Sequence, residues 1–321
     1  MLSSTSSFEA ARKGRGATAI ARLLRTSVIV LLLLGLASEW LLRTQVDPQD
    51  TLQSHLALLD RTQSDRAAFG DSHVARGFDA QQGFVNLAYP SENIEDMIAK
   101  VNMLHQSRSF SRVIVQADPH LFAPYRLNAQ TKTYATNAGS PHGLRIMIPR
   151  YRAQLVAYWQ AFIAGGGQLE SQVRMTQAGS LLSGGDLSQD GLRQRQMDAR
   201  ARMITHRPAD PPRIAAAQQR YSDLLNTLIA RGTRVCLVSF PVSQAYRTAA
   251  SAGGGPGGDA LHAALIRYFA AEANRTGARY VDARGMVTRT ALFRDVDHLN
   301  ADGAAAFSPA LLQRCFGDTQ G

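Results

Sequence analysis

Five short apolar runs, separated by longer stretches with helical periodicity, constrain the fold of this chain more than any other feature of its sequence. Most are rich in alanine, valine, isoleucine or phenylalanine and are bounded by turn-forming residues. This pattern is typical of strands buried on both faces of a parallel sheet. The runs cover residues 67–69, 84–88, 112–117, 234–240 and 278–282.

Helical patterns fill most of the intervals between these runs and predict helices over residues 92–106, 212–231, 259–276 and 301–315. Pro211 and Pro212 can begin one of these helices, and Gly232 and Gly277 can end two of them. Strands that alternate with helices predict an α/β fold, a doubly wound α/β/α (flavodoxin-like) domain with a mostly parallel five-stranded sheet.

Residues 121–211, approximately, interrupt the alternation. A structureless loop of this length is uncommon in a compact domain, so we expect a helical insertion or lid there. Aromatic side chains recur at helical spacing within it, which predicts a packed face or, alternatively, a sugar-stacking surface. They are Tyr151, Tyr158, Trp159 and Phe162.

An apolar run near the N-terminus bears on the compartment. Residues 27–42 read SVIVLLLLGLASEWLL, and Arg22 and Arg25 precede them. A bilayer is crossed by about 20 apolar residues, and basic residues stay on the cytoplasmic side. We therefore expect a basic cytoplasmic tail over residues 1–26 and a transmembrane helix over residues 27–45. The body would then lie on the periplasmic side of a bacterial inner membrane.

A cleaved signal peptide is the alternative interpretation of the same run. Gly35, Leu36 and Ala37 offer small residues at the spacing that a signal peptidase prefers. Both interpretations export the body, which would permit a disulfide. Cys236 nevertheless lies inside a predicted strand, so we expect it to be a packed thiol rather than bonded to Cys315.

The charge balance argues against nucleic acid as a partner. The formal net charge is +10, from 35 basic and 25 acidic residues, and several of the basic residues lie within the first 25. The body is therefore only moderately basic, and its sequence holds no basic stretch with interleaved aromatics. We expect no nucleic-acid partner.

Gly70, Asp71 and Ser72 stand where the first strand should end, before a segment that can begin a helix. Such a strand end lies at the ligand-binding edge of an open α/β sheet. A serine hydroxyl needs a base to act as a nucleophile. Far downstream, Asp295 precedes His298 by three residues. The Asp295 carboxylate can therefore accept a hydrogen bond from the His298 Nδ1 while the His298 Nε2 faces the serine. Ser72, His298 and Asp295 are the candidate catalytic residues.

The order of these pieces resembles the SGNH (GDSL-like) hydrolase and acyltransferase family. Gly70-Asp71-Ser72 matches the first block of the family, and Asp295-x-x-His298 followed by Gly303 matches its last block. The resemblance covers most of the body, residues 52–321, with the insertion outside it. It implies acyl transfer through a Ser-His-Asp triad.

Two middle blocks depart from the family pattern. Ser91 stands where the family usually has a glycine whose amide helps to bind the oxyanion, although its own N–H can still donate. Asp118 stands in the place of an asparagine, so it offers an acceptor where a donor is needed. Asn93, Gln116 or His120 could supply that donor. The candidate oxyanion or substrate-binding residues are therefore Ser91, Asn93, Asp118 and His120.

Other polar residues near the motifs are expected to be structural. Asp71 would organise its turn through local hydrogen bonds, and Asp297 would be solvated or cap a helix. We expect no cofactor and no metal. Several histidines outside the triad should be structural or solvent-exposed, because no metal-ligand spacing links them. These are His73, His105, His120 and His142.

These features predict an exported, membrane-anchored serine acyl-transfer enzyme that O-acetylates a cell-envelope or secreted polysaccharide. The chain resembles membrane-associated members of the family similar to the polysaccharide O-acetylation and teichoic acid D-alanylation proteins. The expected partners are a polysaccharide acceptor, the membrane and a multi-span acyltransferase that supplies acyl groups. The alternatives are a carbohydrate or lipid acetyl esterase and an inactive polysaccharide-binding scaffold.

Overall fold

The computed structural model describes residues 6–46, 51–129, 147–167, 173–251 and 258–317. It divides the chain into two compact units. The first contains Met1–Asp50 and Pro141–Glu170, and the second contains Thr51–Ser140 and Ser171–Gly321. His142 falls outside the described residues, as does the side chain of Tyr151.

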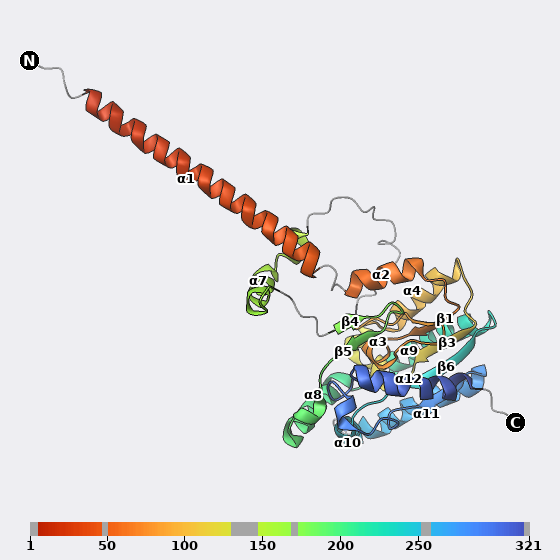
Figure 1. Cartoon of the computed structure of the whole chain (residues 1–321). Coiled ribbons are helices and arrows are strands. Elements are labelled where there is room, and N and C mark those ends of the chain that lie inside the picture. Colours follow the sequence, from red (N-terminus) through yellow and green to blue (C-terminus); the bar gives the residue numbers. More distant parts are fainter. Residues whose placement is uncertain (1–5, 47–50, 130–146, 168–172, 252–257, 318–321) are drawn as a thin grey trace, which may run out of the picture. The chain divides into compact units, whose positions relative to one another are not determined.

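The second unit is built on a five-stranded parallel sheet, with strand order β2-β1-β3-β6-β7 (Figure 1). This order is that of the flavodoxin-like doubly wound folds. The predicted fold class is therefore confirmed, and all five apolar runs form strands. These are β1 (Arg66–Phe69), β2 (Phe84–Asn86), β3 (Arg112–Gln116), β6 (Arg234–Ser239) and β7 (Arg279–Asp282).

Side chains of the central strands alternate between two apolar clusters, because successive residues of a strand point to opposite faces. Ala67 and Val113 face one cluster, whereas Ala68, Ile114 and Cys236 face the other. The central strands β1, β3 and β6 are thus buried on both sides, which explains why their sequences are largely apolar.

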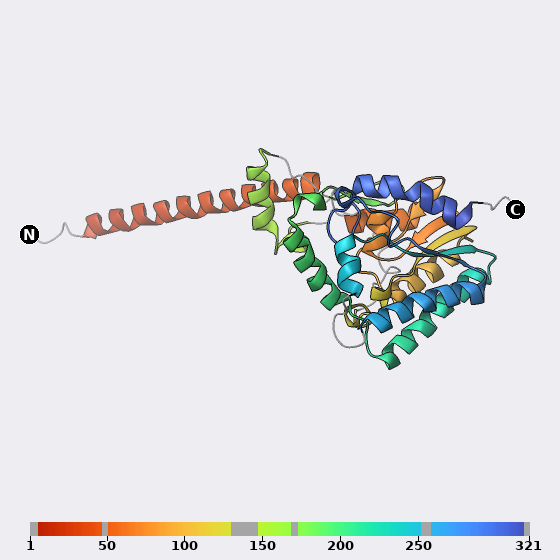
Figure 2. The same cartoon turned by 90° about the horizontal axis from the view of Figure 1, so that it is seen from below.

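Helices cover both faces of this sheet. Residues of α2 (Thr51–Arg61), α4 (Ile94–His105), α9 (Pro211–Ile229) and α11 (Gly258–Thr276) contribute to the first cluster. Residues of α3 (Ser72–Gly77), α8 (Leu192–His206), α10 (Gln244–Ser251) and α12 (Ala301–Phe316) contribute to the second. Figure 2 shows α12 on one side of the sheet and α9 and α11 on the other.

The helix boundaries follow the predicted signals. Asp210 caps α9 by accepting a hydrogen bond from the Arg213 N–H, and prolines occupy the first turn. Beyond α9 and α11, Gly232 and Gly277 adopt φ of +77° and +71°, a backbone conformation that glycine adopts without steric cost. The four predicted helices are all present.

The insertion is not purely helical. It holds the 3-10 helices η3 (Pro119–Phe122) and η4 (Leu187–Gln189) and an antiparallel pair of strands, β4 (Val173–Met175) and β5 (Leu181–Ser183). Three-residue strands are too short to leave a periodic pattern in the sequence. Its helices are α5 (Pro124–Leu127), α6 (Ile148–Tyr151), α7 (Leu155–Ala164) and α8.

The first unit contains α1 (Ser6–Leu41), the π-helix η1 (Leu42–Val46), α6 and α7. The segment Arg22–Val46 is long and apolar enough to cross a membrane, and little of it is buried within the structure. The expected anchor thus exists as a candidate span.

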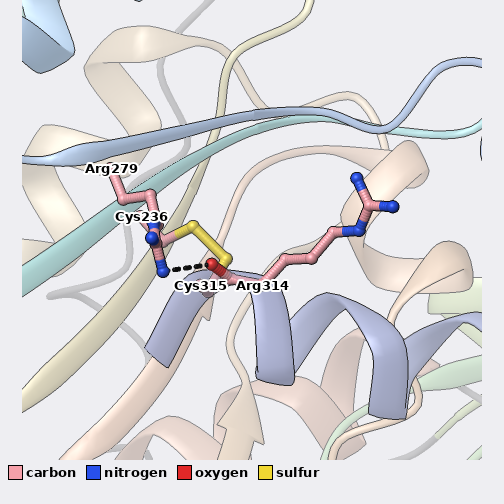
Figure 3. The surroundings of a disulfide bond; sticks show 4 residues. All are labelled: Cys236, Arg279, Arg314 and Cys315. Carbon is pink, nitrogen blue, oxygen red and sulfur yellow. Dashed lines mark hydrogen bonds between the residues drawn. A yellow bond between two sulfur atoms is a disulfide. The ribbon is translucent and has the colours of Figure 1, made fainter. Parts of the chain in front are cut away.

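Cys236 and Cys315 form a disulfide, so the prediction of a packed free thiol was wrong (Figure 3). Their Cα atoms lie 5.5 Å apart, because Cys236 of β6 and the buried residues of α12 belong to the same apolar cluster. The Arg279 guanidinium donates to the Arg314 carbonyl beside it, at 2.8 Å. Since 79 residues separate the two cysteines, only the tertiary fold shows that they meet.

We expect the double variant Cys236→Ala/Cys315→Ala to lose about 4 kcal/mol of unfolding free energy, because the disulfide closes a long loop in the unfolded chain. Urea denaturation of the full chain in detergent measures the loss. Reduction of the parent protein should produce a similar shift, and a shift absent from both samples would contradict the cross-link.

Candidate active site

Ser72 is the first residue of α3, directly after the turn that ends β1. A Cβ on Gly70 would lie 2.4 Å from the Val74 Cγ2 and 2.6 Å from the Gln116 Oε1, so only glycine fits there. Asp71 accepts a hydrogen bond from the His73 N–H at 2.9 Å and caps α3, as predicted. The turn thereby places Ser72 at the carboxyl edge of the sheet.

Ser72, His298 and Asp295 form a continuous line of hydrogen bonds. The Ser72 Oγ lies 2.9 Å from the His298 Nε2, and the His298 Nδ1 lies 2.9 Å from the Asp295 Oδ1. The Asp295 Oδ1 also accepts from the His298 N–H at 3.0 Å. When Nδ1 carries the proton, Nε2 can accept the serine proton. The structure therefore brings the three candidates together in the expected order.

The loop that carries Asp295 and His298 is closed on itself. The Arg294 N–H donates to the His298 carbonyl at 3.0 Å, and Asn300 caps α12 by accepting from the Gly303 N–H at 2.9 Å. A Cβ on Gly303 would lie 2.1 Å from the Leu292 carbonyl oxygen, so a larger residue would push the loop away from α12. This close contact explains why a glycine stands at position 303 of the motif.

Asp297 is buried rather than solvated or capping, so that prediction was wrong. Its Oδ1 lies 3.0 Å from the Arg202 Nε and 3.6 Å from the His298 Nδ1. Burial raises the pKa of Asp297. The neighbouring histidines His298, His73 and His206 outweigh burial and hold this pKa well below its usual range. A second carboxylate therefore lies behind the base.

The His73 imidazole lies between two carboxylates. Its Nδ1 is 3.3 Å from the Asp118 Oδ2, and its Nε2 is 3.3 Å from the Asp297 Oδ2. Burial lowers the pKa of His73, but Asp118 and Asp297 outweigh burial and raise it to about 10. His73 is thus a buried cation at neutral pH, 5.1 Å from the His298 ring between centroids.

Asp71 is held by one cation and by a second buried histidine. Its Oδ2 contacts the Arg126 guanidinium at 2.5 Å and the His120 Nε2 at 2.9 Å. Burial raises the pKa of Asp71, but Arg126 and His120 outweigh burial and keep it well below its usual range. Burial lowers the pKa of His120. The three carboxylates of this buried network, Asp71, Asp118 and Asp297, thus face His73, Arg126 and Arg202.

The other predicted site residues are placed in two groups. Asp118 and His120 belong to the buried network, where Asp118 accepts from the Phe240 N–H at 3.0 Å and from the Gln116 amide at 2.9 Å. Asn93 caps α4 in a capping box with Asp96. Among the described residues, no hydrogen bond joins Ser91 or Asn93 to Ser72.

Ser91 adopts φ of +67°, in the left-handed region. Glycine adopts this conformation most easily, and the resemblance implies a glycine at this position. The backbone of Ser91 therefore has the conformation that glycine adopts most easily, although the residue is serine.

Two groups of buried side chains bring possible metal ligands within 4.8 Å of one another. They are His73, Asp297 and His298, and His73, Asp118 and His120. The same carboxylates already face the His73 imidazolium, and Arg126 and Arg202 contact the carboxylates of the network. We therefore interpret the groups as an ion-pair network.

Sequence reasoning missed Arg126, Arg202 and His206, which complete this network. His206 lies 2.8 Å from the Tyr246 hydroxyl through Nδ1 and stacks on His120. All three residues come from the insertion, whose sequence shows no motif. No sequence signal could have linked them to Ser72.

We expect His73→Gln to lower the unfolding free energy by about 3–5 kcal/mol near pH 6, because it removes the cation that bridges two buried carboxylates. The pKa of His73 is 6.5 when unperturbed and about 10 in the folded protein. The stability from its ion pairs is therefore complete below pH 6.5 and is lost as the pH rises toward 10. The difference between variant and parent should shrink over that range in urea denaturation.

His105→Gln is the matched control, because burial lowers the pKa of this buried histidine. Its effect on unfolding free energy should stay constant between pH 7 and 10. A constant difference for His73→Gln as well would show that His73 is neutral in the folded protein.

No protein-family model and no curated protein matches the chain. Among solved structures, it is similar to a candidate platelet activating factor from Streptococcus pneumonia, with a TM-score of 0.41 and 12% identity over 89% of this chain and 99% of that one. It is also similar to Axe2, an acetylxylan esterase from Geobacillus stearothermophilus, with a TM-score of 0.34 and 10% identity over 79% of this chain and 94% of that one. Neither similarity is close enough to carry a functional argument.

Proposed function

We propose that this chain is a membrane-anchored serine acyl-transfer enzyme of the SGNH type, acting as an O-acetyltransferase on a cell-envelope or secreted polysaccharide. The observation that carries the proposal is the line of hydrogen bonds from Ser72 through His298 to Asp295. It stands at the carboxyl edge of a parallel sheet, where open α/β folds bind their ligands.

In the proposed reaction, the Ser72 Oγ attacks the acyl carbonyl while its proton passes to the His298 Nε2. His298 then gives this proton to the leaving group, and an acyl-serine remains. An acceptor hydroxyl next gives its proton to His298 and attacks the acyl carbon. The bond to the Ser72 Oγ then breaks, and His298 returns the proton to this oxygen. Asp295 holds the His298 ring and stabilises its charged form through both steps.

Two backbone donors are proposed to bind the oxyanion. The Ser72 N–H belongs to the first turn of α3, where amides have no partner within the helix. The Ser91 N–H is the second donor, in the conformation that suits glycine. Asp118 is already an acceptor in the buried network, so we assign it no donor role. A lost donor of this kind costs about 3 to 4 kcal/mol in other acyl-transfer enzymes.

Transfer to a polysaccharide is preferred over hydrolysis because the candidate span Arg22–Val46 would hold the enzyme at a membrane, beside exported glycans and a multi-span acyl donor. The disulfide supports an oxidising compartment, and hence export. The alternative function is an acetyl esterase, which shares every step except that water replaces the acceptor hydroxyl.

We expect the full chain to release the aryl group from an aryl acetate and to acetylate an added oligosaccharide, because both reactions pass through one acyl-serine. Mass spectrometry of the sugar measures transfer. Turnover that rises with acceptor but leaves the sugar unmodified would identify an esterase instead.

Ser72→Ala is the control for this assay and should abolish both turnover and labelling by a fluorophosphonate. Failure of a fluorophosphonate to label Ser72 in the parent chain would indicate an inactive binding protein.

Asp295→Asn should lower kcat/KM by about 10⁴-fold, because an amide cannot hold the His298 ring in the tautomer that accepts the serine proton. Asp297→Asn is the matched variant, since its carboxylate is 3.6 Å rather than 2.9 Å from the same Nδ1. It should lower the unfolding free energy more and kcat/KM less. The reverse order of effects on kcat/KM would assign the orienting role to Asp297.

A further inference from the structure

A short apolar helix in the first unit has no role in the proposed chemistry. The helix α7 reads LVAYWQAFIA and buries none of its residues. Val156 and Ile163 are 70% and 72% exposed. Helices in water usually turn an apolar stripe toward a core. A helix of this length is too short to cross a bilayer, for which about 20 residues are needed.

This helix is attached to the C-terminal end of α1, as Figures 1 and 2 both show. The Trp159 Nε1 donates to the Ser38 Oγ at 3.1 Å, and the rings of Phe162 and Trp40 meet edge to face at 6.0 Å. Tyr158 packs against a small apolar cluster of Leu42, Val46 and Met147. These contacts fix the position of α7 along α1.

The one acidic residue of the apolar run is satisfied at the same place. The Glu39 carboxylate accepts hydrogen bonds from the Met147 N–H at 2.9 Å and the Ile148 N–H at 3.3 Å, and it pairs with Arg43 at 2.6 Å. An unpaired carboxylate near lipid would be costly. Because these partners satisfy its carboxylate, Glu39 can lie at a membrane boundary, where α1 ends.

The length of α1 gives the depth of this attachment. Arg22 and Arg25 mark the first end of the apolar run, and residues 26–41 would extend about 24 Å at 1.5 Å per residue. This is close to the thickness of a hydrocarbon core, about 30 Å. Ser38 and Trp40 therefore reach the opposite boundary, and α7, which contacts both, lies at that same depth.

We propose that α7 is an interfacial membrane helix, whose exposed face with Val156 and Ile163 enters the boundary between lipid headgroups and acyl chains. The occupant of this face is the bilayer itself, because α7 packs against the end of α1, whose own apolar side chains are exposed along the candidate span. The aromatic residues beside it, Trp40, Tyr158 and Trp159, are of the kind that gathers at membrane interfaces. The proposal rests on α1 spanning the membrane and is independent of the acyl-transfer chemistry.

Site-directed spin labelling of the full chain tests this placement. Both native cysteines are in the disulfide, so a single introduced cysteine takes the label. Val156→Cys and Ile163→Cys probe α7, and Leu33→Cys probes the span. Ile204→Cys is the matched control, since this residue is 74% exposed and apolar but lies on α8 of the other unit. The labelled chains are reconstituted into vesicles of phosphatidylethanolamine and phosphatidylglycerol.

Power saturation compares collisions with oxygen, which enriches in lipid, and with a water-soluble nickel chelate. The labels at 156 and 163 should show an oxygen-to-nickel ratio several-fold above that at 204 and below that at 33. Nickel access at positions 156 and 163 equal to that at position 204 would overturn the proposal while leaving the anchor intact. Low access to both reagents would also overturn it, because protein would then cover the helix. Nickel access at position 33 would overturn the anchor and, with it, the placement of α7.

Discussion

The pairing of buried charges beneath Ser72 is the interaction on which the site depends. Asp71 follows the first strand, Asp118 follows the third, and Asp297 lies in the loop before the last helix. Carboxylates buried so close together would repel one another and lose hydration, so each needs a cation. His73 bridges two of them, and the guanidiniums of Arg126 and Arg202 contact Asp71 and Asp297. The network joins the strand ends to the insertion and to the loop that carries Asp295 and His298.

In the proposed enzyme, the residues that hold the site in place are different from those that would carry out the reaction. The Ser72 hydroxyl, the His298 ring and Asp295 form the line through which a proton can move. The buried ion pairs hold the surrounding backbone, and Gly70 and Gly303 let the segments approach closely enough for the line to form. Such an arrangement would suit the proposed acyl transfer, because the proposed nucleophile and base must stay within hydrogen-bonding distance.

Attachment to a membrane would give such an enzyme access to acceptors that leave the cell. In the first unit, α1 supplies a candidate span, and α7 is fixed at its end by Ser38 and Trp40. A single transmembrane helix can rotate about its own axis and tilt from the bilayer normal. A second, interfacial helix packed against it would restrict both motions. The first unit would thus have a defined orientation in the membrane.

The sequence by itself determined the sheet, the main helices, the apolar span and the three residues of the hydrogen-bond line. Strand burial, caps and short motifs are local properties, and local patterns record them. Only the tertiary structure decided that Cys236 bonds to Cys315, that Asp297 is buried, and that Arg126 and Arg202 complete its network. Those facts depend on segments far apart in the chain that meet in space, and an ion pair of this kind leaves no periodic trace in either segment.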